Sequence, residues 1–219
     1  MVFVTVLAAC GSAAPVSTPA DRAAQLERLA IRTAGVPGYE RDAFGPAWAD
    51  VDRNGCDTRN DVLNRDLEHK QWRDGTRRCV VVAGDLTDPY SGATLHFLKA
   101  DASAVQIDHV VALADAWASG AASWSDARRR EFANDPLNLL AVDGRLNQAK
   151  GDSDASEWLP PLTSAHCDYA GRQIAVKSKY GLSVTQAEHD AMASVQARCP
   201  AEAGDQQEDG PDYISGPSS

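Results

Sequence analysis

The sequence has 219 residues, of which 43% are hydrophobic and 24% charged, as in an ordinary globular protein long enough to bury a core. Its formal net charge of −10 excludes a protein that binds nucleic acid over its whole surface, although a locally basic cleft remains compatible with it. Part of the negative charge lies in residues 201–219, which contain Asp and Glu but no Lys or Arg. We expect one domain over residues 21–200 and a disordered acidic tail at 201–219.

Residues 1–20 are typical of an export leader followed by a linker. A short apolar run ends at "LAACG", and a segment rich in Pro, Ser, Thr and Ala follows. The run resembles the end of a bacterial lipoprotein signal with Cys10 as the lipidated residue, but it lacks the positively charged start of such signals. The alternative is an ordinary secretion signal with an incidental cysteine. Both interpretations predict an exported protein, extracellular or held at the cell surface.

The first half of the domain contains two predicted helices and a hairpin. Apolar residues at helical spacing predict a helix within residues 21–35, ending at Gly35, and a second helix over 56–70. Two β-rich runs, at 77–86 and 93–98, flank the turn-forming sequence "TDPYSG". We therefore expect these two runs to pair as a hairpin.

The second half alternates short strands and helices. A strand is predicted over 104–113, breaking near Asp108 and His109, and a helix over 123–135 ends at an Asn-Asp-Pro turn. A brief strand at 138–142 and a short helix at 143–150 follow. Two further amphipathic helices are predicted over residues 166–182 and 183–199.

The cysteines support export. With Cys10 set aside, the four that remain allow three disulfide pairings. Their order along the chain favours Cys56–Cys79 and Cys167–Cys199, each closing a modest loop. A zinc site is the competing interpretation, but no two of these cysteines have the close spacing of a zinc knuckle.

Four polar residues occur in an order that indicates a catalytic site. Asp108 and His109 lie at a strand end, Asn138 at the next strand, and Asn147 in the helix after it. This sequence resembles the HNH endonucleases, a group with a ββα-metal (His-Me finger) core. The segments "CDTRNDVL", "DPYSG" and "DHVVALADAW" resemble its exported bacterial branch, which is related to the C-terminal nuclease domain of GmrSD restriction enzymes. The likeness runs from about residue 35 to 200. It implies an α+β fold in which a ββα-metal core is embedded in additional helices.

The resemblance also implies a role for each motif residue. His109 would take a proton from the attacking water, and Asn138 would hydrogen-bond backbone near His109. Asp108 and Asn147 would offer oxygen ligands to one divalent ion, Mg²⁺ or another such as Mn²⁺ or Zn²⁺. Asp108 reaches the ion only if the strand end kinks, because neighbouring side chains of a regular strand point to opposite faces.

Three cations are candidates for contacts with nucleic acid. Lys150 follows Asn147 and is expected to meet phosphate or backbone, with a plain helix C-terminal cation as the alternative. Arg59 suits bidentate phosphate binding but equally suits a structural pair with a nearby Asp. Arg145 lies on the same short helix as Lys150.

These expectations combine into a monomeric, exported, metal-dependent endonuclease that hydrolyses DNA and leaves a 5′-phosphate and a 3′-hydroxyl. Two alternatives remain open. One is a cell-surface lipoprotein that keeps the fold and only binds, and the other is an antibacterial toxin with the same chemistry. The binding alternative predicts that Asp108, His109 and Asn147 do not converge on one point.

Overall fold

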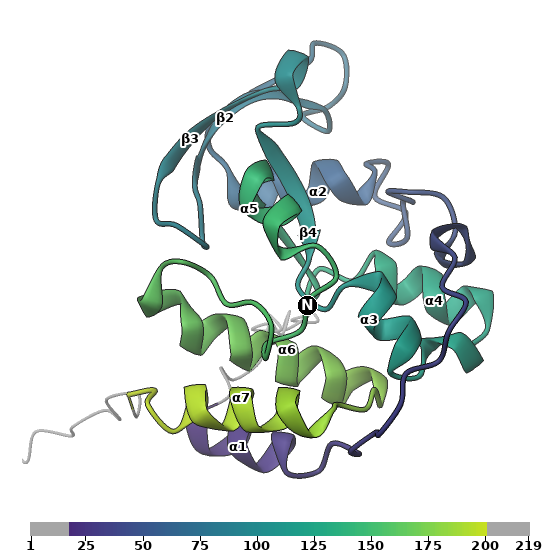
Figure 1. The fold of residues 1–219 in the computed structure, drawn as a ribbon. Helices are drawn as coiled ribbons and strands as arrows, with labels where there is room; N and C mark the ends of the chain where they lie inside the picture. The colour runs from purple at the N-terminus through teal and green to yellow at the C-terminus, as the bar shows by residue number, and fades with distance from the viewer. Residues whose placement is uncertain (1–17, 201–219) are drawn as a thin grey trace, which may run out of the picture.

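Two antiparallel sheets and a set of helices make up residues 18–200, the part of the chain that the computed structural model describes (Figure 1). The mixture of small sheets and helices confirms the expected α+β class. The first helix, α1 (Pro19–Leu26), begins two residues before the expected start of the domain. Cys10, the leader up to residue 17 and the acidic tail at 201–219 lie outside the described residues.

The larger sheet has three strands in the order β1 (Glu68–Trp72), β2 (Val81–Thr87), β3 (Thr94–Leu98). Strands β2 and β3 form the predicted hairpin. The helix expected over 56–70 was wrong in its last four residues, because α2 (Thr58–Asp66) ends at Asp66 and the chain turns into β1. The sequence "EHKQW" of β1 carries no helical apolar stripe, and its pairing with β2 is irregular.

The smaller sheet and the helix after it form a ββα unit. Strand β4 (Val105–His109) pairs antiparallel with β5 (Leu139–Asp143), and α5 (Gly144–Lys150) follows β5 without a loop. This close turn requires glycine, because a Cβ on Gly144 would lie 2.0 Å from the carbonyl oxygen of Ser103. The order of elements is the one implied by the resemblance.

Helices α1, α6 (His166–Tyr180) and α7 (Gln186–Gln196) pack together on the side of the molecule away from the larger sheet (Figure 1). The first helix ends at Leu26, not near Gly35 as predicted. The chain then turns over residues 27–29 and bridges to Val184 through Ile31. The apolar residues buried in this helical layer are Leu26, Ala155, Ala170, Ile174, Val184, Met192 and Val195.

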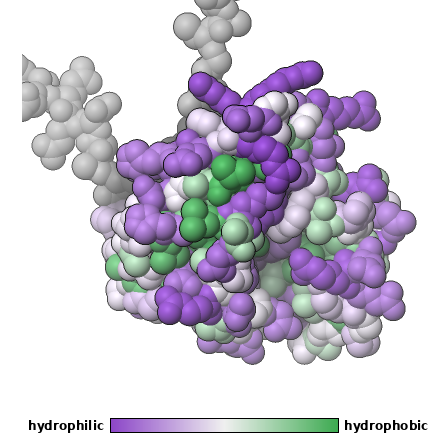
Figure 2. Space-filling model, turned by 90° about the horizontal axis from the view of Figure 1, so that it is seen from above, coloured by the Kyte–Doolittle hydropathy of each residue, from purple (hydrophilic) through white to green (hydrophobic). Residues whose placement is uncertain are grey.

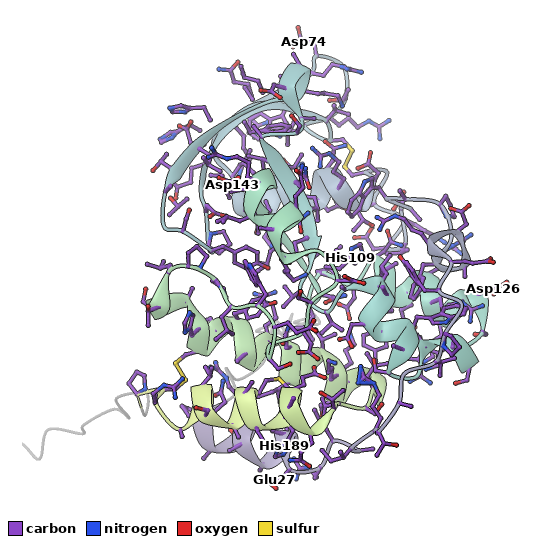
Figure 3. The ribbon with its side chains drawn as sticks, in the orientation of Figure 1. Glu27, Asp74, His109, Asp126, Asp143 and His189 are labelled. Carbon is purple, nitrogen blue, oxygen red and sulfur yellow. A yellow bond between two sulfur atoms is a disulfide. The ribbon has the colours of Figure 1, made fainter. Side chains whose placement is uncertain are left out.

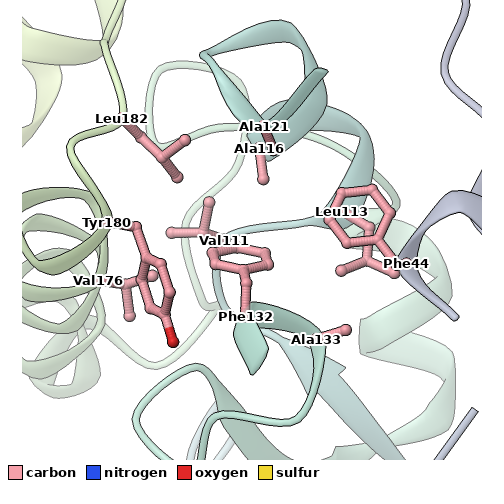
Figure 4. Packing of buried hydrophobic residues seen from close by; sticks show 10 residues of the cluster. All are labelled: Phe44, Val111, Leu113, Ala116, Ala121, Phe132, Ala133, Val176, Tyr180 and Leu182. Atoms are coloured by element: carbon pink, nitrogen blue, oxygen red, sulfur yellow. The ribbon is translucent and has the colours of Figure 1, made fainter. Parts of the chain in front are cut away.

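The long insert between the two strands of the ββα unit contains two helices where one was expected. Helix α3 (Leu113–Ala118) precedes the predicted α4 (Asp126–Ala133). Both contribute to a core that also includes η1 (Arg41–Phe44), a single 3₁₀ turn. The buried side chains of this core, shown in Figure 4, are Phe44, Val111, Leu113, Ala116, Ala121, Phe132, Ala133, Val176, Tyr180 and Leu182. The insert is therefore part of the folded body.

Both predicted disulfides are present. Cys56–Cys79 joins the residues before α2 to those before β2, and Cys167–Cys199 joins α6 to the segment after α7. Because all four cysteines are paired, the alternative zinc site on them is excluded.

A buried cluster of charges connects α6 to α3 and α7. Lys177 on α6 lies 2.7 Å from Asp115 Oδ2 and 2.5 Å from Glu188 Oε1, and Arg32 lies 3.1 Å from Asp115 Oδ1. The three residues of this cluster that lie on helices, Asp115, Lys177 and Glu188, are buried. Burial raises the pKa of the Glu188 carboxyl above its usual 4.5, so the folded protein holds this proton to a higher pH than the unfolded chain does.

The raised pKa of Glu188 predicts a pH-dependent stability. Above pH 4.5 the folded state binds more protons than the unfolded state, so the free energy of unfolding falls as the pH rises through the raised pKa. We expect the Glu188 carboxyl to lower the free energy of unfolding by on the order of 1 to 2 kcal/mol between pH 5 and pH 8. Urea denaturation should show the decrease in the wild type and a smaller one in Glu188→Gln. Equal pH slopes in the two proteins would contradict the assignment.

The face seen in Figure 2 is mostly hydrophilic, with several hydrophobic areas between the polar side chains. Large hydrophobic side chains that are exposed in the described residues are few: Ile31, Val36 and Tyr39 in the segment between α1 and η1, Val51 before α2, and Leu98 at the end of β3. Within residues 18–200, no helix has both the length and the apolar character needed to cross a membrane.

Candidate active site

Asp108, His109 and Asn147 meet at the end of β4. Asp108 and His109 are the last two residues of this strand, and Asn147 lies on α5, which packs against it. All three line one pocket of about 210 Å³, together with Arg41 and others. Figure 3 places His109 near the middle of the molecule, between the sheets and the helical layer. The strand ends at this position, so two neighbouring residues reach a common pocket.

The carboxylate of Asp108 is buried and held by two donors. Lys150 Nζ lies 2.9 Å from Oδ1, and the Tyr90 hydroxyl donates to Oδ2 at 2.5 Å. Burial, followed by the charge of Asp108, raises the pKa of Tyr90 well above its usual value, so this hydroxyl keeps its proton. Lys150 also donates to the carbonyl of His109 at 2.9 Å, and its side chain has no exposed surface. The carboxylate is thus fixed in position and neutralised by one buried cation.

A hydrogen bond of the His109 imidazole defines which ring nitrogen carries the proton. Nε2 lies 2.8 Å from the carbonyl oxygen of Ala133, which only accepts, so Nε2 carries the hydrogen and Nδ1 is the basic nitrogen. Burial lowers the pKa of His109 to about 4, and the charges of Arg41 and Lys150 lower it as well. The ring is therefore neutral at pH 7. Trp48 stacks on it with ring planes 9° apart and centroids 6.0 Å apart.

Asn138 fixes the backbone immediately after His109. Its side chain has no exposed surface, its Oδ1 accepts from the Val111 N–H at 2.8 Å, and its Nδ2 donates to the Val111 carbonyl at 3.1 Å. The Asn138 carbonyl also accepts from the Val110 N–H at 2.8 Å. These bonds join the chain leaving β4 to the chain entering β5, at the position where the pocket lies.

Removing the Asn138 amide should destabilise the protein. Asn138→Ala leaves a buried N–H and a buried carbonyl of Val111 without partners, and each costs about 1 to 3 kcal/mol. We expect a loss of about 2 to 4 kcal/mol in the free energy of unfolding, measured by urea denaturation. Gln148→Ala, which removes an exposed amide from α5, is the control and should stay within about 0.5 kcal/mol. A loss no larger than that of the control would contradict this role.

The oxygen atoms at the pocket are suitable for a divalent ion. Asn147 Nδ2 donates to Gln106 Oε1 at 2.9 Å, which leaves the amide oxygen of Asn147 as its uncommitted atom. Each oxygen of Asp108 accepts one hydrogen bond and keeps a second lone pair. Carboxylate and amide oxygens are ligands that Mg²⁺ prefers, so the residues fit such an ion. No three His, Cys, Asp or Glu side chains gather as a metal site anywhere in residues 18–200, and water and substrate would have to complete the coordination.

The three candidate phosphate-binding cations lie in different environments. Lys150 contacts a backbone carbonyl and a carboxylate, and its burial leaves none of it at the surface. Arg59 lies over the Phe97 ring and 3.5 Å from the Val105 carbonyl, where burial lowers its pKa. Arg145 is exposed and pairs with Asp143 at 3.2 Å. Neither arginine lines the pocket that contains His109.

Several residues of the site carry no signal that singled them out in the sequence. Tyr90 lies in the turn of the hairpin, and Gln106 is one more polar residue in β4. Arg41 and Trp48 come from the loop before α2, which sequence patterns describe only as turn-rich and aromatic. Trp48 also has a backbone φ of 60°, a conformation that bulky residues rarely adopt. Its position over His109 depends on tertiary packing.

Two comparisons with known proteins give matches to this chain. A family model described as GmrSD restriction endonucleases, C-terminal domain, matches residues 57–195. An uncharacterized secreted protein of Arthroderma benhamiae is 45% identical over 205 residues, which cover 90% of this chain and 95% of that protein. No solved structure matches the chain.

Proposed function

Because the chain belongs to the family of GmrSD restriction endonuclease C-terminal domains, we propose that it is an exported, metal-dependent endonuclease that hydrolyses phosphodiester bonds of DNA. The observation that carries this proposal is the meeting of Asp108, His109 and Asn147 in one pocket. A protein that kept the fold only for binding would not need an imidazole, a carboxylate and an amide oxygen at a common point.

His109 is the proposed general base. A neutral imidazole with Nε2 held by the Ala133 carbonyl can accept a proton from water at Nδ1. The hydrogen bond fixes the tautomer, and Trp48 limits rotation of the ring from one face. Asn138 acts as a positioning residue, because it holds the backbone of Val111 two residues after the base.

Asp108 and Asn147 are the proposed protein ligands of one divalent ion, Mg²⁺ or a similar ion. When bound, such an ion neutralises the charge that develops on the leaving oxygen and phosphate. Lys150 and Tyr90 orient the Asp108 carboxylate, and Gln106 orients the Asn147 amide. Such outer partners fix the direction of the ligand oxygens. The proposed products are a 5′-phosphate and a 3′-hydroxyl.

The role of Asn147 is tested by the metal dependence of cleavage. Asn147→Ala should require a Mg²⁺ concentration at least about 10-fold higher than the wild type for half-maximal cleavage of plasmid DNA, since one of the two proposed protein ligands is lost. Gln148→Ala on the exposed side of α5 is the control and should match the wild type. An unchanged Mg²⁺ dependence in Asn147→Ala would remove this residue from the metal site.

Export and a monomeric state complete the proposal. The two disulfides support an oxidising compartment, as does the naming of the fungal relative as a secreted protein. Cys10 lies outside the described residues. Its lipidation can be tested by mass spectrometry of the protein recovered from its producing cells. Incubation with single- and double-stranded DNA and RNA identifies the preferred substrate.

A further inference from the structure

Arg41 lies at the mouth of the candidate site. It is the first residue of η1, is exposed, and lines two adjoining pockets that both include His109. One is the pocket with Asp108 and Asn147, and the other, of about 130 Å³, includes Trp48 and Asn134. No other residue of the loop that precedes α2 reaches the pocket with Asp108.

The guanidinium of Arg41 has no structural role in the described residues. Between residues 18 and 200, no carboxylate lies within ion-pair distance of it and it makes no hydrogen bond through its side chain. Neighbouring arginines differ: Arg128 donates to the Tyr180 carbonyl, and Arg129 donates to the carbonyls of Ala43 and Trp124. Arg41 is thus a cation with five donors available for a ligand.

The backbone that carries Arg41 is firmly held. Phe44, three residues on, is 2% exposed and packs against Phe132 and Trp117. The Ala43 carbonyl accepts from Arg129 Nε at 2.9 Å. A cation fixed in this way loses less freedom on binding than one on a mobile loop. This segment precedes residue 57, where the match to the family model begins.

The charges of the pocket indicate the ligand. Asp108 is negative, and Lys150 balances it from a buried position that a substrate does not reach. A phosphodiester entering the pocket therefore needs another positive group, and Arg41 is the cation that lines it. A guanidinium matches the paired oxygens of a phosphate.

We infer that Arg41 binds the non-bridging oxygens of the substrate phosphate beside His109, so that a residue outside the matched family domain completes the nuclease site. This inference rests on the proposed function for the identity of the substrate. It assigns Arg41 to substrate binding, separate from the metal ligands and from the base.

The test is binding of a fluorescently labelled DNA oligonucleotide in EDTA, measured by anisotropy at several KCl concentrations. A lost charge-assisted phosphate contact should weaken binding by Arg41→Ala about 10-fold and reduce the slope of log affinity against log salt by about one. Arg41→Lys should restore the slope. Arg28→Ala, which removes an exposed arginine near the end of α1, is the matched control and should leave both quantities at the wild-type value.

The outcomes separate this inference from the proposed function. Wild-type affinity and slope in Arg41→Ala, or equal losses in Arg41→Ala and Arg28→Ala, would overturn the role of Arg41 even if the wild type cleaves DNA in Mg²⁺. A specific loss of binding in Arg41→Ala would support it even if the wild type cleaved nothing, in which case the nuclease proposal alone would fail.

Discussion

His109→Ala should lower the rate of DNA cleavage in Mg²⁺ by about 10² to 10⁴-fold, the contribution typical of a positioned general base. The neutral imidazole, with its proton fixed on Nε2 by the Ala133 carbonyl, is the group in the pocket able to accept a proton at pH 7. The measurement is the initial rate of plasmid linearisation. The circular dichroism spectrum should remain that of the wild type, because the ring is only partly buried.

A second histidine provides the control for this prediction. His96 on β3 is 82% exposed in its side chain and pairs with Asp85 at the surface, away from the pocket. His96→Ala should therefore cleave at the wild-type rate. If His109→Ala retained full activity in a preparation free of contaminating nuclease, another group would have to be the base.

Lys150→Met should destabilise the protein by about 3 to 5 kcal/mol, because it leaves the buried Asp108 carboxylate without its countercharge. Methionine has a similar length, so the loss of packing is small. The His109 carbonyl loses a donor in the same change. Urea denaturation measures the effect as a lower midpoint with an unchanged slope.

Two comparisons make the Lys150 prediction specific. Lys99→Met removes an exposed lysine and should change stability by less than about 0.5 kcal/mol. Combining Lys150→Met with Asp108→Asn removes the buried charge and should recover part of the lost stability. If Lys150→Met is as stable as Lys99→Met, the buried ion pair does not contribute as proposed.

The fold was predictable where a local pattern coincided with a strong turn or cap signal. The β2–β3 hairpin flanks an Asp-Pro-Tyr-Ser-Gly turn, and the β4–β5–α5 order follows from short alternating runs. Strand β1 was missed because "EHKQW" is polar and exists as a strand only by pairing with β2. The six-residue helix α3 was missed because its apolar run "VVALADAW" suits either a buried strand or a helix.

The sequence predicted the motif residues of the site, but not the residues that surround them. Asp108, His109 and Asn147 do line one pocket. The partnership of Lys150 with Asp108 spans 42 positions of sequence, and spacing along the chain carries no sign of it. The same applies to Trp48 over His109, and to Arg41, which the packing of Phe44 brings to the pocket. Long-range contacts of this kind depend on tertiary structure.

Hydrolysis of nucleic acid in this pocket should depend on a divalent ion. The most direct measurement is the conversion of supercoiled plasmid to nicked and linear forms by the purified, disulfide-intact protein. We expect steady conversion in Mg²⁺ that stops when excess EDTA is added and resumes when Mg²⁺ is restored. Plasmid that stays supercoiled in Mg²⁺, or cleavage that continues in EDTA, would contradict it.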